Sequence, residues 1–106
     1  MAGTAAATHP AVAEAVEAAR EARLLASTMA ILGWDQETMM PAGGLEHRAR
    51  QLAQLARLEH GMSTSPRLGE LLDRAADAVA GLPETHADRV NVREFRRDYD
   101  LSLIHI

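Results

Sequence analysis

Residues 65–83 carry the clearest secondary-structure signal in the chain, reading Ser-Pro-Arg-Leu-Gly-Glu-Leu-Leu-Asp-Arg-Ala-Ala-Asp-Ala-Val-Ala-Gly-Leu-Pro. Ser65 and Pro66 indicate a helix start, because serine caps free amide groups and proline loses no hydrogen bond in a first turn. Gly81 and Pro83 indicate its end. Between them the apolar residues keep the three-and-four spacing of one helix face: Leu68, Leu71, Leu72, Ala75, Ala76 and Val79. Since no stretch shows sustained period-two alternation, the sequence predicts an all-α fold.

The sequence before this segment predicts a long first helix. It begins at His9 and Pro10 and meets no helix breaker before Gly33. Two apolar faces lie on it, so we expect it to be buried on two sides. One face is narrow and rich in small residues, Val12, Ala15, Ala19, Ala22, Ala26 and Met29, and the second holds Leu24, Thr28, Ile31 and Leu32.

Two more helices complete the prediction. Residues 45–60 return to helical spacing, and Gly61 is expected to end that helix. The last helix is expected near Thr85, where Thr85-x-x-Asp88 has the spacing of a capping box, and it runs through Val92, Phe95 and Tyr99. We therefore expect about four helices, arranged in antiparallel hairpins.

Residues 33–44, Gly-Trp-Asp-Gln-Glu-Thr-Met-Met-Pro-Ala-Gly-Gly, interrupt the helical pattern and are expected to form a loop or an irregular helix end. The apolar side chains of Trp34, Met39 and Met40 indicate that this segment packs against other residues. Asp35 and Glu37 beside Trp34 allow an acid/base pair. We favour a structural role, in which Asp35 makes local hydrogen bonds and Trp34 anchors a core. The pair Gly43-Gly44 is too short to be the glycine-rich motif of a nucleotide-binding loop.

Length and composition exclude several classes of protein. The 106 residues suggest one domain at most, and their net charge of −4 is the wrong sign for binding nucleic acid or an anionic membrane. The longest apolar stretch, residues 24–32, is much shorter than the roughly 18 residues of a membrane span. With no cysteine and no secretory signal, we expect a soluble, cytoplasmic protein.

Histidines and arginines offer two further candidate sites. The five histidines, never three or four residues apart, are interpreted as surface residues rather than metal ligands: His9, His47, His60, His86 and His105. A basic line of Arg89, Arg93, Arg96 and Arg97 would suit a phosphate, but acidic residues are interleaved with it. We favour an ion-paired face.

Two segments resemble a known family. Residues 31–44, followed by Arg48, Gln51 and Leu52, resemble the N-terminal signature of the carboxypeptidase Taq family of metallopeptidases, although Met39 replaces a frequent tyrosine and Ala42 a frequent second proline. Residues 91–100, with Arg96-Arg97-x-Tyr99-Asp100, resemble the next helix of that family. The resemblance covers most of residues 10–100.

The resemblance implies a fragment of a larger enzyme. Members of this family are mainly helical, thermostable zinc carboxypeptidases that remove C-terminal amino acids from peptides with broad specificity, and we expect the full-length enzyme to be cytoplasmic and homodimeric. Zinc, or cobalt in its place, would be held by two histidines of a His-Glu-x-x-His helix and a later glutamate, with the motif's glutamate as base. None of these residues is present, so we assign no catalytic, cofactor-binding or metal residue to this chain. We expect the chain alone to be inactive. In the full-length enzyme it would form helical walls and part of a lid over the cleft.

The two ends of the chain differ from the segment between them. We expect residues 1–8 to be a flexible N-terminus, residues 9–100 to be the N-terminal helical segment, and residues 101–106 to be a non-native tail. The sequence Leu-Ser-Leu-Ile-His-Ile exposes four large aliphatic residues, and it is one translation of CTG TCT CTT ATA CAC ATC, which resembles a transposon end used in sequencing libraries.

An alternative to the enzyme fragment is a small non-catalytic helical interaction module. Peptide preference, the metal used in the cell, oligomeric contacts and the origin of the truncation stay open.

Overall fold

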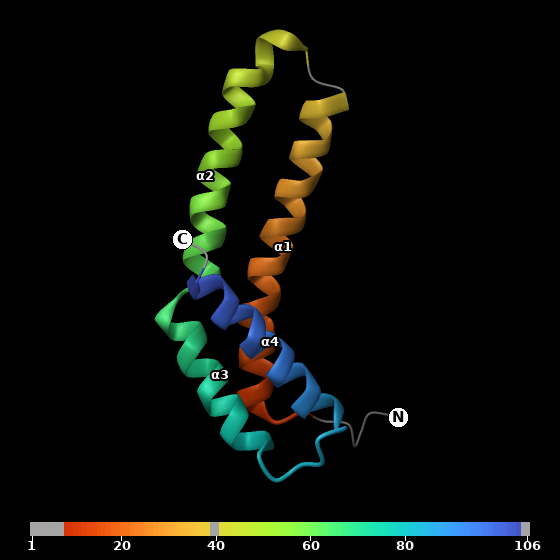
Figure 1. Cartoon of the computed structure of the whole chain (residues 1–106), viewed down its shortest axis with the longest axis vertical. Helices are drawn as coiled ribbons and strands as arrows, with labels where there is room; N and C mark the ends of the chain where they lie inside the picture. Colours follow the sequence, from red (N-terminus) through yellow and green to blue (C-terminus); the bar gives the residue numbers. More distant parts are fainter. Residues whose placement is uncertain (1–7, 39–40, 105–106) are drawn as a thin grey trace.

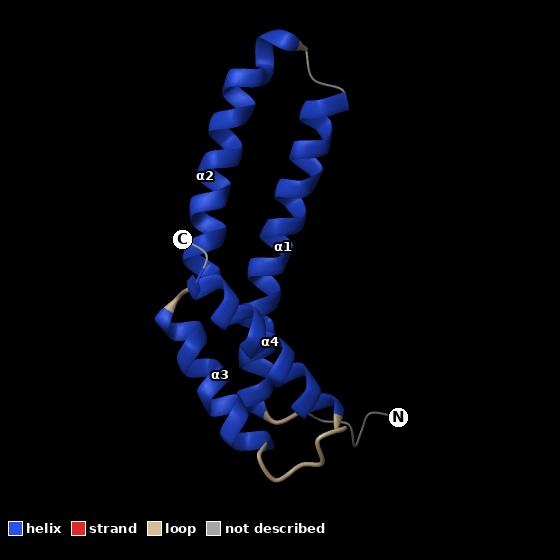
Figure 2. Cartoon of the chain, viewed as in Figure 1, coloured by secondary structure: helices blue, strands red, loops and turns tan. Residues whose placement is uncertain are grey.

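The computed structural model describes residues 8–38 and 41–104, and every regular element in these ranges is helical (Figure 2). This confirms the all-α prediction. The elements are listed in chain order here: α1 (Pro10–Thr38), the short 3-10 helix η2 (Ala42–Gly44), α2 (Leu45–Ser63), α3 (Pro66–Val79) and α4 (Ala87–Ile104). No helix in the described ranges is both long enough and apolar enough to cross a membrane.

The long helix α1 organises the molecule. Its 29 residues span roughly 43 Å at 1.5 Å per residue. In Figure 1, α2 runs back along the C-terminal half of α1, and α3 continues beside the N-terminal half. Helix α4 then turns back against α3 and packs on α1, so the expected antiparallel hairpins are present as α1–α2 and α3–α4.

Two regions can be defined on this basis. The core end consists of residues 10–23 of α1 together with α3 and α4, and the arm consists of residues 24–38 of α1 together with η2 and α2. The Cα radius of gyration is 17.4 Å, against about 13 Å for a compact domain of this length. The projecting arm accounts for this extended shape (Figure 1).

The buried apolar residues of the described chain all lie in the core end. Small residues on α1 allow α3 and α4 to approach closely, and larger side chains from α3 and α4 fill the space between the helices. The core consists of Val12, Ala15, Ala19, Ala22, Leu68, Leu71, Leu72, Ala75, Val79, Val92, Phe95 and Tyr99. This confirms the narrow face predicted on α1 as far as Ala22. Ala26 is exposed, contrary to prediction, because α3 and α4 flank mainly the N-terminal half of α1 (Figure 1).

The second apolar face predicted on α1 is largely uncovered. Leu24 and Ile31 are 69% and 66% exposed, so the expectation of burial on two sides is wrong for this chain. Trp34 is 62% exposed and anchors no core, while Met39 and Met40 lie outside the described residues. The sequence pattern identified an apolar face correctly but did not say what lies against it.

Two predicted helix ends are also wrong. Gly33 lies inside α1, which continues to Thr38, and Gly61 lies inside α2, which continues to Ser63. A glycine inside a helix costs only about 1 kcal/mol relative to alanine, so neighbouring helical residues can carry the helix through it. Of the two alternatives expected for residues 33–44, the part that contains Trp34 and Asp35 is therefore the end of a helix rather than a loop.

Side-chain caps define three helix starts. Ser65 Oγ accepts a hydrogen bond from the Leu68 amide at 3.0 Å, as predicted. His9 Nδ1 accepts a hydrogen bond from the Ala11 amide at 3.0 Å, which confirms the predicted start of α1.

The cap of α4 differs from the prediction. It is His86, whose Nδ1 accepts a hydrogen bond from the Asp88 amide at 3.1 Å, and not Thr85. The helix starts at Ala87, so Thr85 lies too far upstream to cap it.

The C-terminal residues continue α4 without a break through Ile104. Leu101, Leu103 and Ile104 are exposed on this last turn. A non-native origin of residues 101–106 stays a prediction. Of the N-terminal segment predicted to be flexible, residues 1–7 lie outside the described ranges.

A close contact between α3 and α4 fixes the corner where α2 meets α3. The Tyr99 hydroxyl donates a hydrogen bond to the Ser65 carbonyl oxygen at 3.1 Å. It passes so near Gly69 that a Cβ placed there would lie 2.7 Å from the hydroxyl oxygen. Gly69 therefore provides the space that this tyrosine occupies.

Candidate functional site

Arg48 connects the two helices of the arm near their far end. Its Nη1 donates to the Leu32 carbonyl oxygen at 3.0 Å and to Asp35 Oδ2 at 2.9 Å, and its Nε donates to Gln51 Oε1 at 3.0 Å. The Arg48 side chain is only 14% exposed, so its guanidinium is held in a fixed position. We call this group of contacts among Leu32, Asp35, Arg48 and Gln51 the arm clasp.

The arm clasp decides between the two interpretations of Asp35. Residues two apart on a helix point to different faces, so Asp35 and Glu37 do not face a common site. The Asp35 carboxylate accepts a hydrogen bond from Arg48, and Glu37 is exposed. The arrangement supports the structural role favoured for Asp35 and not the acid/base pair.

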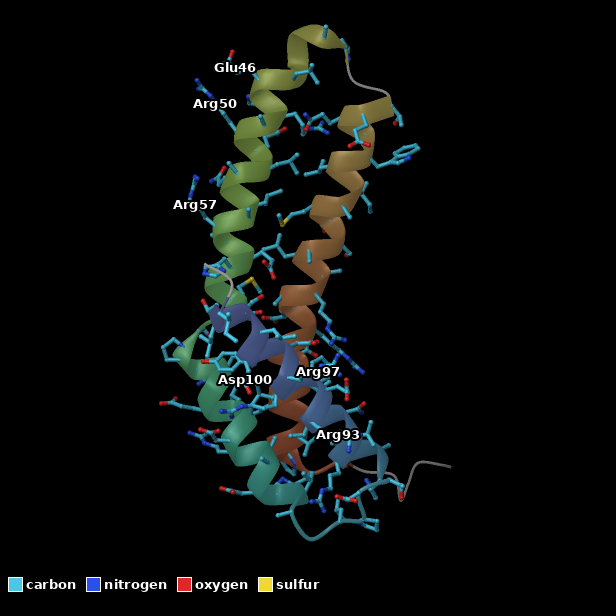
Figure 3. All side chains as sticks on the ribbon, in the orientation of Figure 1. Glu46, Arg50, Arg57, Arg93, Arg97 and Asp100 are labelled. Atoms are coloured by element: carbon cyan, nitrogen blue, oxygen red, sulfur yellow. The ribbon has the colours of Figure 1, made fainter. Side chains whose placement is uncertain are left out.

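The basic line on α4 is ion-paired at Arg93, Arg96 and Arg97, as favoured from the sequence, whereas Arg89 binds backbone carbonyls. Figure 3 shows Arg93 and Arg97 projecting from α4, and each lies within salt-bridge distance of Glu94, at 3.7 and 3.5 Å. Arg89 Nη1 donates to the backbone carbonyls of Ala80 and Leu82 at 3.3 and 2.6 Å and so closes the turn after α3.

Arg96 links α3 to α4. It pairs with Asp73 across the two helices and, through Nε, with Asp100 Oδ1 at 3.3 Å. Hydrogen bonding to Asp73, reinforced by the negative charges of both aspartates, raises the pKa of Arg96 further above its ordinary value. Arg96 is therefore committed to its two aspartate partners, whereas Arg93 and Arg97 pair with Glu94 on their own helix.

A small cavity lies where the arm meets the core end. It has a volume of about 160 Å³ and is walled by residues of all four α-helices, including Ala22, Leu68 and Tyr99. Arg23 closes one side by pairing with Asp98 and lying 4.4 Å above the Phe95 ring. Ligand pockets usually measure about 300–1,000 Å³, so this cavity is too small for a peptide.

Four of the five histidines lie in the described residues, at separate places. His9 and His86 cap helices, His47 and His60 are exposed on α2, and His105 lies outside the described residues. Within residues 8–38 and 41–104, no three His, Cys, Asp or Glu side chains come together in a way that could hold a metal ion. These residues therefore do not fit a zinc site. That the chain carries no catalytic or metal-binding residue stays a prediction.

Sequence reasoning missed the role of Arg48, although it named the residue as part of the signature. The available signal was an aspartate and an arginine on either side of a glycine-rich turn, with complementary charge. This signal becomes specific only when α1 and α2 are known to form a hairpin. Asp35, Arg48 and Gln51, which are separate parts of the signature in sequence, meet in the arm clasp.

Comparison with known proteins extends over nearly the whole described chain. "Thermostable carboxypeptidase 1" of Thermus thermophilus is 46% identical over 85 residues, which are 80% of this chain and 17% of that protein. The chain thus spans about a sixth of the length of this relative. No solved structure gave a significant match. Residues 14–103 match the family model described as Carboxypeptidase Taq (M32) metallopeptidase, and the chain therefore belongs to this family.

Proposed function

We propose that this chain is the N-terminal helical segment of a zinc-dependent carboxypeptidase, and that it shapes the wall and lid of the cleft without supplying catalytic residues. The observation that carries the proposal is the family match over residues 14–103 combined with coverage of only 17% of the relative. Broad release of C-terminal amino acids, a cytoplasmic location and a homodimeric full-length enzyme are parts of the same proposal.

The side chains of this segment support a structural rather than a catalytic contribution to the full-length enzyme. It contains no His-Glu-x-x-His sequence, and its described residues do not fit a metal site. The charged side chains in the clasp and on α4 are used in contacts between or within helices. A zinc ion, or cobalt in its place, and the base that activates water would thus belong to residues outside this chain.

A chimeric enzyme tests the proposal directly. The aligned 85-residue segment of the Thermus thermophilus relative would be exchanged for the corresponding segment of this chain. We expect the chimera to release C-terminal amino acids from peptides when supplied with zinc, at a rate within roughly tenfold of the parent, because the segment positions but does not perform the reaction. A folded chimera that is inactive beside an active parent would contradict the proposal.

Two further measurements examine its separate parts. The purified 106-residue chain should release no C-terminal amino acid from peptides with added zinc or cobalt, and measurable metal-dependent release would refute its predicted inactivity. Sequencing the source locus past Asp100 should reveal a His-Glu-x-x-His motif downstream. An intact reading frame that lacks this motif would argue against a zinc enzyme.

The exposed apolar residues of α1 favour a second candidate, a small helical module that binds a partner. Sedimentation and thermal melting separate it from the first. A monodisperse chain that melts cooperatively supports an independent module. We expect aggregation and a broad melt, because helices removed from their partners are marginal in water.

A further inference from the structure

An apolar stripe, defined as Leu24, Ile31 and Trp34, runs along the outer side of the arm. These side chains are 62–69% exposed, whereas Leu25, Met29 and Leu32 of the same helix are half-buried. Leu24 and Ile31 are seven residues apart, and Trp34 follows three residues later, so all three fall on one helix face. The stripe spans the eleven residues from Leu24 to Trp34, whose ten steps cover roughly 15 Å of helix.

The hydroxyl groups of α1 near the stripe are turned back onto the helix. Ser27 Oγ and Thr28 Oγ1 both donate to the Leu24 carbonyl oxygen, at 2.7 and 3.1 Å. Thr38 Oγ1 donates to the Trp34 carbonyl oxygen at 2.8 Å. With these donors satisfied inside the helix, the face can lose water without leaving a hydroxyl proton unpaired.

The outer side of α2 has a different character. Figure 3 shows Glu46, Arg50 and Arg57 projecting from α2 away from α1, and Glu46 pairs with Arg50 at 3.3 Å. A charged face of this kind suits contact with water. The arm therefore has an apolar side on α1 and a charged side on α2, and the arm clasp keeps the two helices together.

We propose that the apolar stripe is the docking surface for an apolar helix of the longer polypeptide to which this segment belongs. This inference rests on the proposed function, and its occupant is argued from length. The segment matches 17% of the relative, so about five-sixths of a chain of that length is available to cover the stripe.

Paired substitutions in the chimera and in the isolated chain test the inference. Leu24→Gln with Ile31→Gln alters the stripe, and Leu45→Gln with Leu58→Gln alters two exposed leucines of α2 as a matched control. In the active chimera we expect the stripe pair to speed thermal inactivation by roughly tenfold or more, because buried apolar area is lost, and the α2 pair to change it less than about twofold. In the isolated chain, where the stripe has no partner to cover it, neither pair should make the melt less cooperative than that of the unchanged chain.

The outcomes separate this inference from the proposed function. An active chimera whose inactivation rate is unaffected by the stripe pair, or equally affected by both pairs, overturns the docking surface while the proposed function stands. A second copy of the chain is the competing occupant, and Trp34, the only tryptophan, reports on it. In the isolated chain, kept at concentrations below the onset of aggregation, its fluorescence should stay that of a water-exposed indole. A blue shift that grows with concentration, together with a dimer in sedimentation, would assign the stripe to self-association instead.

Discussion

The core end and the arm share the helix α1 but are stabilised differently. Every buried apolar side chain in the described ranges belongs to the core end, and α2 contributes none. In the arm, two helices lie side by side with a polar clasp near their far end and half-buried leucines between them. One amphipathic pair of helices cannot bury its apolar faces completely, whereas three helices packed together can.

The difference shows that burial depends on neighbours more than on sequence pattern. Residues of α1 in the arm are as apolar as those in the core end, yet Leu24 and Ile31 are exposed where Val12 and Ala15 are buried. The two regions should therefore respond differently to substitution. The expected losses in the free energy of opening of each region, measured in the chimera, decrease from the first variant below to the last.

The largest effect is expected for Leu72→Ala in the core end. Leu72 is 1% exposed, so its truncation removes buried apolar surface and leaves a cavity. In the chimera we expect a loss of about 2–5 kcal/mol in the free energy of opening of the core-end amides, measured by native-state hydrogen exchange. Leu58→Ala in the arm is the matched control and should cost less than about 0.5 kcal/mol, because Leu58 is exposed. Equal losses from both variants would contradict the division into two regions.

Gly69→Ala should cost about 1–3 kcal/mol, because the new methyl group would collide with the Tyr99 ring and hydroxyl. Tyr99→Phe alone should cost about 1 kcal/mol through loss of the hydrogen bond to Ser65. Combined, the two changes should destabilise less than the sum of their separate effects, since removal of the hydroxyl relieves part of the collision. Strict additivity in this double-mutant cycle would show that Gly69 and Tyr99 are not coupled.

Arg48→Met tests whether the arm depends on its clasp. We expect the free energy of local opening in α2 to fall by about 1–2 kcal/mol, because three hydrogen bonds of a charged group are lost. Hydrogen exchange should show faster exchange of α2 amides with little change in α3. Arg48→Lys should not restore protection, because an ammonium group lacks the planar fork that reaches several acceptors. Faster exchange throughout the core end would mean that the two regions open together.

His86→Ala should have the smallest effect, about 0.5–1 kcal/mol, through loss of the cap on α4. His86→Asn keeps an acceptor for the Asp88 amide and should retain most of the stability. Hydrogen exchange of the α4 amides in the two chimera variants, side by side, measures the difference. If both lose the same amount, the imidazole does not act as the cap.

The sequence predicted best those features that depend on residues close together in the chain. The α3 helix was predicted from its apolar spacing and from the Ser65 cap, both of which are local signals. The arm clasp was not predicted, because Asp35 and Arg48 meet only after the chain reverses direction. The exposure of Trp34 was not predicted either, since an apolar pattern does not tell whether the covering partner belongs to the same segment. Gly33 indicated the end of the first helix, but the helical residues on both sides of it continue α1 to Thr38.

The hydrogen bond from Tyr99 to the Ser65 carbonyl has a consequence for synthesis of the chain on the ribosome. Its two residues are 34 positions apart, and Tyr99 lies in α4, which is made after α1, α2 and α3. Residues of α1, α2 and α3 leave the ribosome before the side chain that secures the α2–α3 junction has been incorporated. The direction of the arm relative to α3 is thus stabilised late, as a property of the nearly finished segment and not of the helices that form the junction.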